Sequence, residues 1–165
     1  MRARTSTWYE TKIKYQKTME DGSKKVVNEL YVVDALSCTE AETSIIEEMS
    51  YYISGDSAVT SAKKTNYGEI FFSDLDDDDK WYKAKLQFIT IDEKSEKEKR
   101  SNVTYLVQAK SLARALRYID EVMGKTMIDY DVVGLNETKL MDVFEHHAPN
   151  EKKEEKNDVP EYEEK

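Results

Sequence analysis

Apolar and polar positions alternate at two places in the chain, and both segments begin with Trp-Tyr. The first segment is WYETKIKY, residues 8–15, and the second is WYKAKLQF, residues 81–88. A period of two residues is typical of a half-buried β-strand. The apolar side chains of the first segment fall mainly on its odd-numbered residues. We therefore expect that side to face the core and Trp8 to lie on the opposite, solvent-facing side.

Each of these strands is followed by a return strand and then by an amphipathic helix. The turn MEDGSKK contains Asp-Gly, a strong hairpin signal, and predicts a return strand over 26–35. The second copy turns instead through the polar loop 92–101. A Ser or Thr with Glu three residues later predicts that the first helix begins near residue 37. The apolar stripe of the second helix begins near Ser111.

The chain is extended again after each helix, which gives the order ββαββ twice. The extended segments are 57–64 and 67–73 in the first copy, and 129–135 and 139–145 in the second. We predict an α+β protein in which two tandem ββαββ copies form one continuous antiparallel sheet with both helices packed on one side. Read across the junction, four strands precede the second helix. This order resembles the unit of the Whirly and PUR single-strand-binding folds, as an analogy of element order only.

Matching residues recur in the same order over about 65 positions, which argues for a tandem duplication. For example, YVVDALS (31–37) matches YLVQAKS (105–111) after one inserted residue. The predicted organisation is a disordered start (1–7), repeat 1 (8–73), an acidic linker (74–80), repeat 2 (81–147) and a disordered acidic tail (148–165).

Charge is distributed unevenly along the 165 residues, whose formal net charge is -9. Residues 146–165 hold seven acids and four lysines, a net -3, and residues 74–79 hold five aspartates, a net -5, which leaves -1 for the rest. The predicted folded part is thus near neutral. Nucleic-acid binding is compatible with this balance, because local patches decide it more than the total does.

The composition favours a protein that works inside a cell. No apolar run approaches the roughly 20 residues that a membrane helix needs, and the start MRARTSTW lacks the apolar segment of a secretory signal. The only cysteine, Cys38, has no partner for an internal disulfide. We expect a soluble cytoplasmic protein that does not bind membranes. The oligomeric state stays open.

Motifs for catalysis, cofactors and metals are missing. No Gly-rich phosphate loop and no nucleophile elbow occurs. The adjacent His146 and His147 would point to opposite sides of a strand. The run DLDDDDK resembles the start of a calcium loop but has Asp79 in place of the turn glycine and Lys85 in place of the bidentate glutamate. We expect no cofactor, no metal and no enzymatic activity.

One pattern points to single-stranded nucleic acid. In both copies a tryptophan shares its strand side with lysines, a side that holds few apolar residues. Bases stack on aromatic rings, and lysines follow the phosphates. The candidate nucleic-acid-binding residues are Trp8, Lys12, Lys14, Trp81, Lys83 and Lys85. The acidic tail would compete for this surface or recruit a protein partner.

Two other interpretations stay open. The tryptophans are also consistent with packing inside the protein, because aromatic residues suit pleated surfaces. The whole chain is also consistent with a protein–protein adaptor or a structural module.

Five segments resemble a family described as a domain of unknown function from Bacteroidetes and their crAss-like phages. The segments are YVVDALSCTEAE, IIEEM, YYISGD, KWYKAKLQFITIDEKS and MDVFE. The resemblance runs from about residue 8 to 145. It implies a small bacterial or phage accessory protein and no particular catalytic or binding residues.

Overall fold

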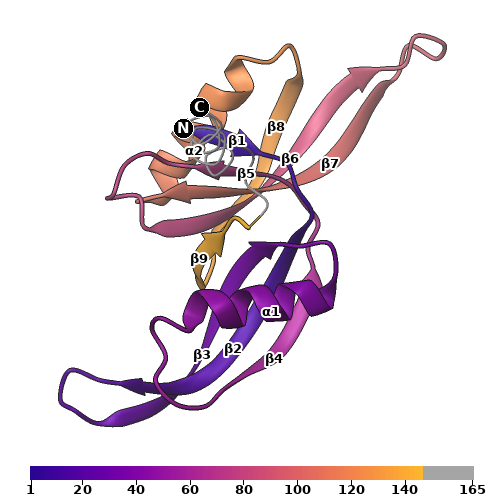
Figure 1. Cartoon of the computed structure of the whole chain (residues 1–165). Coiled ribbons are helices and arrows are strands. Elements are labelled where there is room, and N and C mark those ends of the chain that lie inside the picture. Colours follow the sequence, from indigo (N-terminus) through magenta and orange to yellow (C-terminus); the bar gives the residue numbers. More distant parts are fainter. Residues whose placement is uncertain (147–165) are drawn as a thin grey trace, which may run out of the picture.

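The computed structural model describes residues 1–146, which form nine strands and two helices (Figure 1). The strands are β1 (Arg2–Arg4), β2 (Trp8–Thr18), β3 (Lys24–Asp34), β4 (Ser57–Lys64), β5 (Tyr67–Phe72), β6 (Lys80–Ile91), β7 (Glu98–Ala109), β8 (Asp129–Glu137) and β9 (Leu140–Phe144); the helices are α1 (Cys38–Met49) and α2 (Leu112–Gly124). We call β2–β5 with α1 the first half and β6–β9 with α2 the second half. The predicted α+β class is confirmed.

The strands form two sheets instead of the single antiparallel sheet that we predicted. One sheet has the order β1-β5-β7-β6-β8 and the other has the order β4-β2-β3-β9. Most neighbours are antiparallel, but β5 pairs with β7 and β9 pairs with β3 in parallel. The prediction of one antiparallel sheet is therefore wrong, because alternation identifies a strand without fixing its neighbour.

Each half gives its last strand to the sheet of the other half. Strand β4 pairs with β2, and after only two residues β5 pairs with β7 of the second half. In the same way β8 pairs with β6, whereas β9 crosses to β3 of the first half. The Whirly and PUR analogy does not describe this topology, because β4 and β5–β7 lie in different sheets.

Equivalent threonines hold the two crossings. The amide and hydroxyl of Thr65 both donate to the carbonyl of Trp8, at 2.8 and 2.9 Å. The amide and hydroxyl of Thr138 donate to the carbonyl of Trp81, at 2.9 and 2.7 Å. Each threonine thereby ties the end of one strand to the start of another. Each tryptophan backbone is thus part of a crossing point.

Both helices begin as the sequence predicts. The hydroxyl of Ser37 accepts from the Glu40 amide, and the hydroxyl of Ser111 accepts from the Arg114 amide, as N-cap residues do. Helix α1 packs on β2, β3 and β4, and α2 packs on β7 and β8. The helices thus cover different sheets, which corrects the prediction that both lie on one side of a single sheet.

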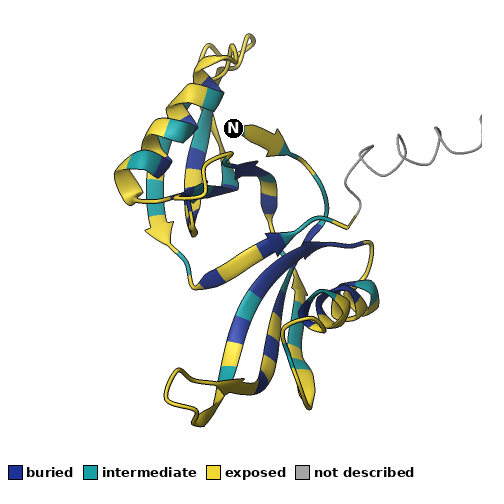
Figure 2. Ribbon diagram, turned by 60° about the vertical axis from the view of Figure 1, so that its left-hand side comes forward, coloured by how far each residue is buried: buried dark blue, intermediate teal, exposed yellow. Residues whose placement is uncertain are grey.

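The core has three parts, and the middle part joins the sheets. Alternate residues of β2 and β3 pack against α1, and alternate residues of β6 and β7 pack against α2. The intervening residues near the strand starts meet in a central cluster between the sheets. Figure 2 shows buried segments where the sheets meet and exposed residues at the ends of the long hairpins. We call the face of each sheet that its helix does not cover the open face.

The start of the chain is more ordered than we predicted, and one aspartate of the acidic linker is buried. Residues 2–4 form β1, which pairs with β5, so the expected disordered start is wrong there. Arg4 forms ion pairs with Asp34 at 2.8 Å and with Glu145 at 2.6 Å. In the linker, Asp78 is only 1% exposed, whereas the other four aspartates are exposed. The predicted tail, residues 148–165, lies outside the described residues.

Asp78 anchors the linker to the start of α2. It accepts hydrogen bonds from the Ser73 and Tyr118 hydroxyls, the Lys110 amide and the Arg114 guanidinium. Burial alone would raise the pKa of Asp78, but these bonds outweigh it and lower the pKa below its ordinary value.

Candidate functional site

The two predicted base-stacking residues lie in the core. Trp8 is 1% exposed and Trp81 is 2% exposed, and both belong to the central cluster between the sheets. Phe72 lies between them, with ring centroids 6.3 Å from Trp8 and 5.7 Å from Trp81. The prediction that the indole rings face solvent is wrong. The even-numbered residues of β2 share one face of the strand. This face packs on the other sheet at Trp8 and is exposed to solvent further along, at Lys12 and Lys14.

The four predicted lysines are exposed on the open faces. Lys12 and Lys14 follow Trp8 along β2, and Lys83 and Lys85 follow Trp81 along β6. The residues that alternate with these lysines along β2 and β6 point to the opposite face of each sheet and pack beneath the helices. The structure therefore separates the predicted set into a buried aromatic pair and two exposed lysine pairs.

Two adjoining hollows bring some of these lysines together. The first has a volume of about 200 Å³ and is lined by Lys12 and Lys63, and the second has a volume of about 360 Å³ and is lined by Lys63, Lys64 and Lys83. Glu10 lines both hollows. We call the two together the lysine groove. It spans strands of both sheets, with residues from β2, β3 and β4 of one sheet and from β5 and β6 of the other.

The lysine groove is cationic although the chain as a whole is acidic. Among residues 1–146, none of Lys12, Lys63, Lys64 and Lys83 forms an ion pair. Glu10 is the acidic residue that lines the groove. Burial and the nearby Glu10 carboxylate raise the pKa of Tyr67 in the groove wall to about 12. A set of unpaired ammonium groups around a hollow is suited to bind phosphate groups.

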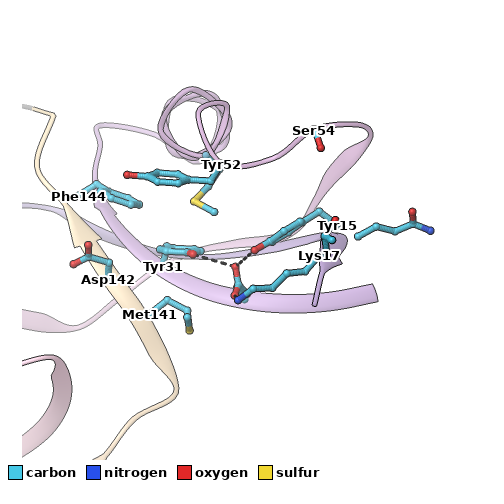
Figure 3. Close-up of a pocket in the computed structure, with 12 residues that line it drawn as sticks. Tyr15, Lys17, Tyr31, Tyr52, Ser54, Met141, Asp142 and Phe144 are labelled. Carbon is cyan, nitrogen blue, oxygen red and sulfur yellow. Dashed lines mark hydrogen bonds and ion pairs between the residues drawn. The ribbon is translucent and has the colours of Figure 1, made fainter. Parts of the chain in front are cut away.

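A further hollow of about 500 Å³ lies at the outer end of the first half, beside the C-terminal end of α1 (Figure 3). The hydroxyls of Tyr15 and Tyr31 converge there on Oε1 of Glu29, at 2.5 and 3.1 Å (Figure 3). The ring of Tyr31 stacks on Phe144 of β9, with centroids 5.4 Å apart. We call this hollow the Glu29 pocket.

Negative groups dominate the electrostatics of the Glu29 pocket. Burial and the Glu29 carboxylate raise the pKa of Tyr15 to about 12, and the same two causes raise that of Tyr31. Desolvation and the Glu48 carboxylate raise the pKa of Asp142, although the Val143 amide donates to it. The Nζ of Lys17 lies 3.8 Å from Oε2 of Glu29, too far for a hydrogen bond.

Asp78 of the acidic linker and His146 are engaged in structural contacts. In residues 1–146, no group of three or more His, Cys, Asp or Glu side chains is arranged to hold a metal ion. The backbone amide of His146 donates to Asp34 at 2.5 Å, and its Nε2 lies 3.0 Å from Glu48. His147 lies outside the described residues.

Within residues 1–146, no helix is both long and apolar enough to cross a membrane.

Sequence reasoning missed two groups of residues. Lys63 and Lys64 end a strand that holds no tryptophan, so the Trp/Lys pattern does not include them. Glu29 lies two residues before the YVVDALS match, where the second copy has Val103. A glutamate in one copy at the position where the other copy has a valine is the sequence signal that indicates the Glu29 pocket.

The crossed sheets and the hollows on their faces define an α+β protein whose candidate binding surfaces lie on strands. Residues 7–146 match a domain of unknown function (DUF4494), and the chain belongs to that family. No curated protein matches the chain. The predicted resemblance to a family of unknown function is thus confirmed, and its expected occurrence in Bacteroidetes and their phages stays a prediction.

Proposed function

We propose that this protein is a non-catalytic accessory protein that binds single-stranded nucleic acid through the lysine groove. The unpaired lysines around the two adjoining hollows carry the proposal. Lys14 and Lys85 extend the cationic surface along the open faces beyond the groove. Because both indole rings are buried, the contacts are made to backbone phosphates instead of stacked bases.

The shape of the surface favours one strand over a duplex. The groove lies where two sheet faces meet, and its larger hollow has a volume of about 360 Å³. A duplex presents its phosphates on a convex cylinder, which cannot enter a hollow of this size. A single strand can bend into it and place successive phosphates near Lys63, Lys64 and Lys83.

The test is a binding titration with a fluorescein-labelled oligothymidine, followed by fluorescence anisotropy at low salt. The variant K63E/K64E/K83E should lower the affinity at least tenfold. The control K94E/K97E/K125E changes the net charge equally at exposed positions outside the groove and should keep most of the affinity. Oligoribonucleotide and duplex arms define the preferred form. No binding by the wild type, or equal losses in both variants, would refute the proposal.

We also propose that the two halves arose by duplication and that the tail regulates binding. Thr65 and Thr138 make equivalent bonds 73 residues apart, which supports the duplication. Residues 148–165 are rich in acids and would compete with nucleic acid for the lysines. Deletion of this segment should strengthen oligothymidine binding severalfold. An unchanged affinity would remove the regulatory role and leave the groove untouched. We place the protein in the bacterial cytoplasm, with a phage gene as its proposed source.

A further inference from the structure

The two halves have the same frame, but one position of the hairpin holds a carboxylate in the first half and an apolar side chain in the second. In the first half Ile13 pairs with Glu29, and in the second half Leu86 pairs with Val103. Two residues further along the hairpin, the pairs again correspond: Thr11 pairs with Tyr31 in the first half, and Ala84 pairs with Tyr105 in the second. By strand register, Glu29 therefore occupies the position of Val103.

A carboxylate at this position is not needed for the fold. The second half builds the same hairpin under its helix with Val103 there, and with Phe88 where the first half has Tyr15. Glu29 is 8% exposed, and burial of a carboxylate destabilises a protein unless its oxygens are well paired. The first half thus keeps a costly polar group where an apolar one is sufficient.

The partners of Glu29 satisfy only one of its oxygens with hydrogen bonds. Both tyrosine hydroxyls donate to Oε1, whereas the nearest cation to Oε2 is Lys17 at 3.8 Å. The two tyrosines fix the carboxylate in place and leave Oε2 able to accept from a further donor. A pre-positioned carboxylate at the wall of a hollow is suited to bind a cationic donor.

The other walls of the Glu29 pocket suit the same kind of ligand. Tyr31 and Phe144 provide stacked rings, and Tyr52 provides an exposed ring on the side of α1 (Figure 3). Aromatic faces attract cations. Asp142 of β9 adds a second carboxylate to the lining. The hollow, of about 500 Å³, is large enough for a long side chain or a small amine.

We propose that the Glu29 pocket binds an ammonium or guanidinium group, which forms an ion pair with Oε2 of Glu29 and packs against the aromatic walls. This group belongs either to a free polyamine or to a basic side chain of a partner. The proposal is independent of nucleic-acid binding, because the Glu29 pocket and the lysine groove are lined by different residues.

The test uses NMR of protein with ¹³C-labelled methionine methyl groups. Met49 and Met141 line the Glu29 pocket, and Met127 is an internal reference at an exposed position of the second half. The probes are spermidine and the blocked peptide acetyl-Gly-Arg-Gly-amide, with triacetylspermidine as a neutral control. Saturable shifts of the Met49 and Met141 signals with the charged probes, and none with the neutral one, are expected. Tighter binding of either probe identifies the source of the cation.

Two variants and one control make the test specific. Y15F/E29V gives the first half the residues of the second half, so it should fold normally and weaken probe binding at least tenfold. K17A removes the cation that competes for Oε2 and should strengthen binding severalfold. E121Q removes an exposed carboxylate from α2 and should have no effect. The proposal is overturned if neither charged probe shifts Met49 and Met141, if the Met127 signal shifts equally, or if folded Y15F/E29V binds as the wild type does.

Discussion

The first and second halves share their buried frame and differ on the surfaces that can bind. Trp8 and Trp81 occupy equivalent positions, and both are buried between the sheets. In contrast, Glu10 in the first half corresponds to Lys83 in the second, and both line the lysine groove. What the halves share therefore stabilises the fold, and the proposed binding sites contain residues at which the halves differ.

The largest expected effect comes from residues that the halves share. Replacing Trp8 or Trp81 with alanine should lower the free energy of unfolding by about 3–5 kcal/mol, because each ring fills the central cluster. Within residues 1–146 the indole nitrogen of Trp8 has no hydrogen-bond partner, so Trp8→Phe should cost much less. Urea denaturation measures both effects. A loss below about 1 kcal/mol for the alanine variants would contradict the burial of the rings.

The next effect concerns the segments that lead into each half. Asp78 anchors the linker before β6, whereas Arg4 anchors the segment before β2. Asp78→Ala leaves the Arg114 and Tyr118 donors without their acceptor and should cost about 3 kcal/mol.

The same carboxylate makes stability depend on pH. Because its folded pKa lies below the unfolded value of about 3.9, the contribution is present at neutral pH and is lost as the pH falls through the folded pKa. Glu145 acts in the same direction, since bonds from Arg2 and Arg4 outweigh its burial and lower its pKa. Urea denaturation between pH 7 and pH 2 should show a smaller loss of stability in Asp78→Ala than in the wild type. Parallel curves would contradict this assignment.

Exchanging Glu29 and Val103 between the halves should change stability by unequal amounts. Val103→Glu places a carboxylate where Phe88 has no hydroxyl to donate, and should cost about 1–3 kcal/mol. Y15F/E29V, which makes the opposite exchange, should change stability by less than about 1 kcal/mol. Thermal unfolding of the two variants side by side checks this. Equal destabilisation would mean that Glu29 is part of the shared frame.

The smallest expected effect comes from a charge exchange in the lysine groove. Glu10→Lys gives the first half the charge of the second and should strengthen oligothymidine binding severalfold. Lys83→Glu makes the reverse exchange and should weaken binding by a similar factor, about 1 kcal/mol at low salt. Fluorescence anisotropy measures both affinities. Changes of the same sign in both variants would contradict a role for these positions.

Much of the fold could be predicted from the sequence, because the signals that define an element are local. The strand 57–64 and the N-cap residues Ser37 and Ser111 are where the patterns placed them. The exchange of β5 and β9 between the sheets could not be predicted, because alternation carries no information on which strand is the neighbour.

The candidate site was predicted only in part, for a related reason. One side of β2 is buried at Trp8 and exposed at Lys12 and Lys14, because the second sheet covers only the start of that side. Alternation distinguishes the two sides of a strand, but it does not show where along a side another sheet packs. The lysines were therefore located correctly on the open face, whereas the indole rings were not.

The shared tryptophans hold the sheets together, and we propose that the groove lysines contact phosphates. The most direct test is the salt dependence of oligothymidine binding by the wild type and by K63E/K64E/K83E. Each phosphate contact to a single strand adds about 0.7 to the slope of log affinity against log salt. The slope for the variant should be smaller by about 2, and tryptophan emission should not change on binding. An unaltered slope, together with quenched tryptophan emission, would contradict this proposal.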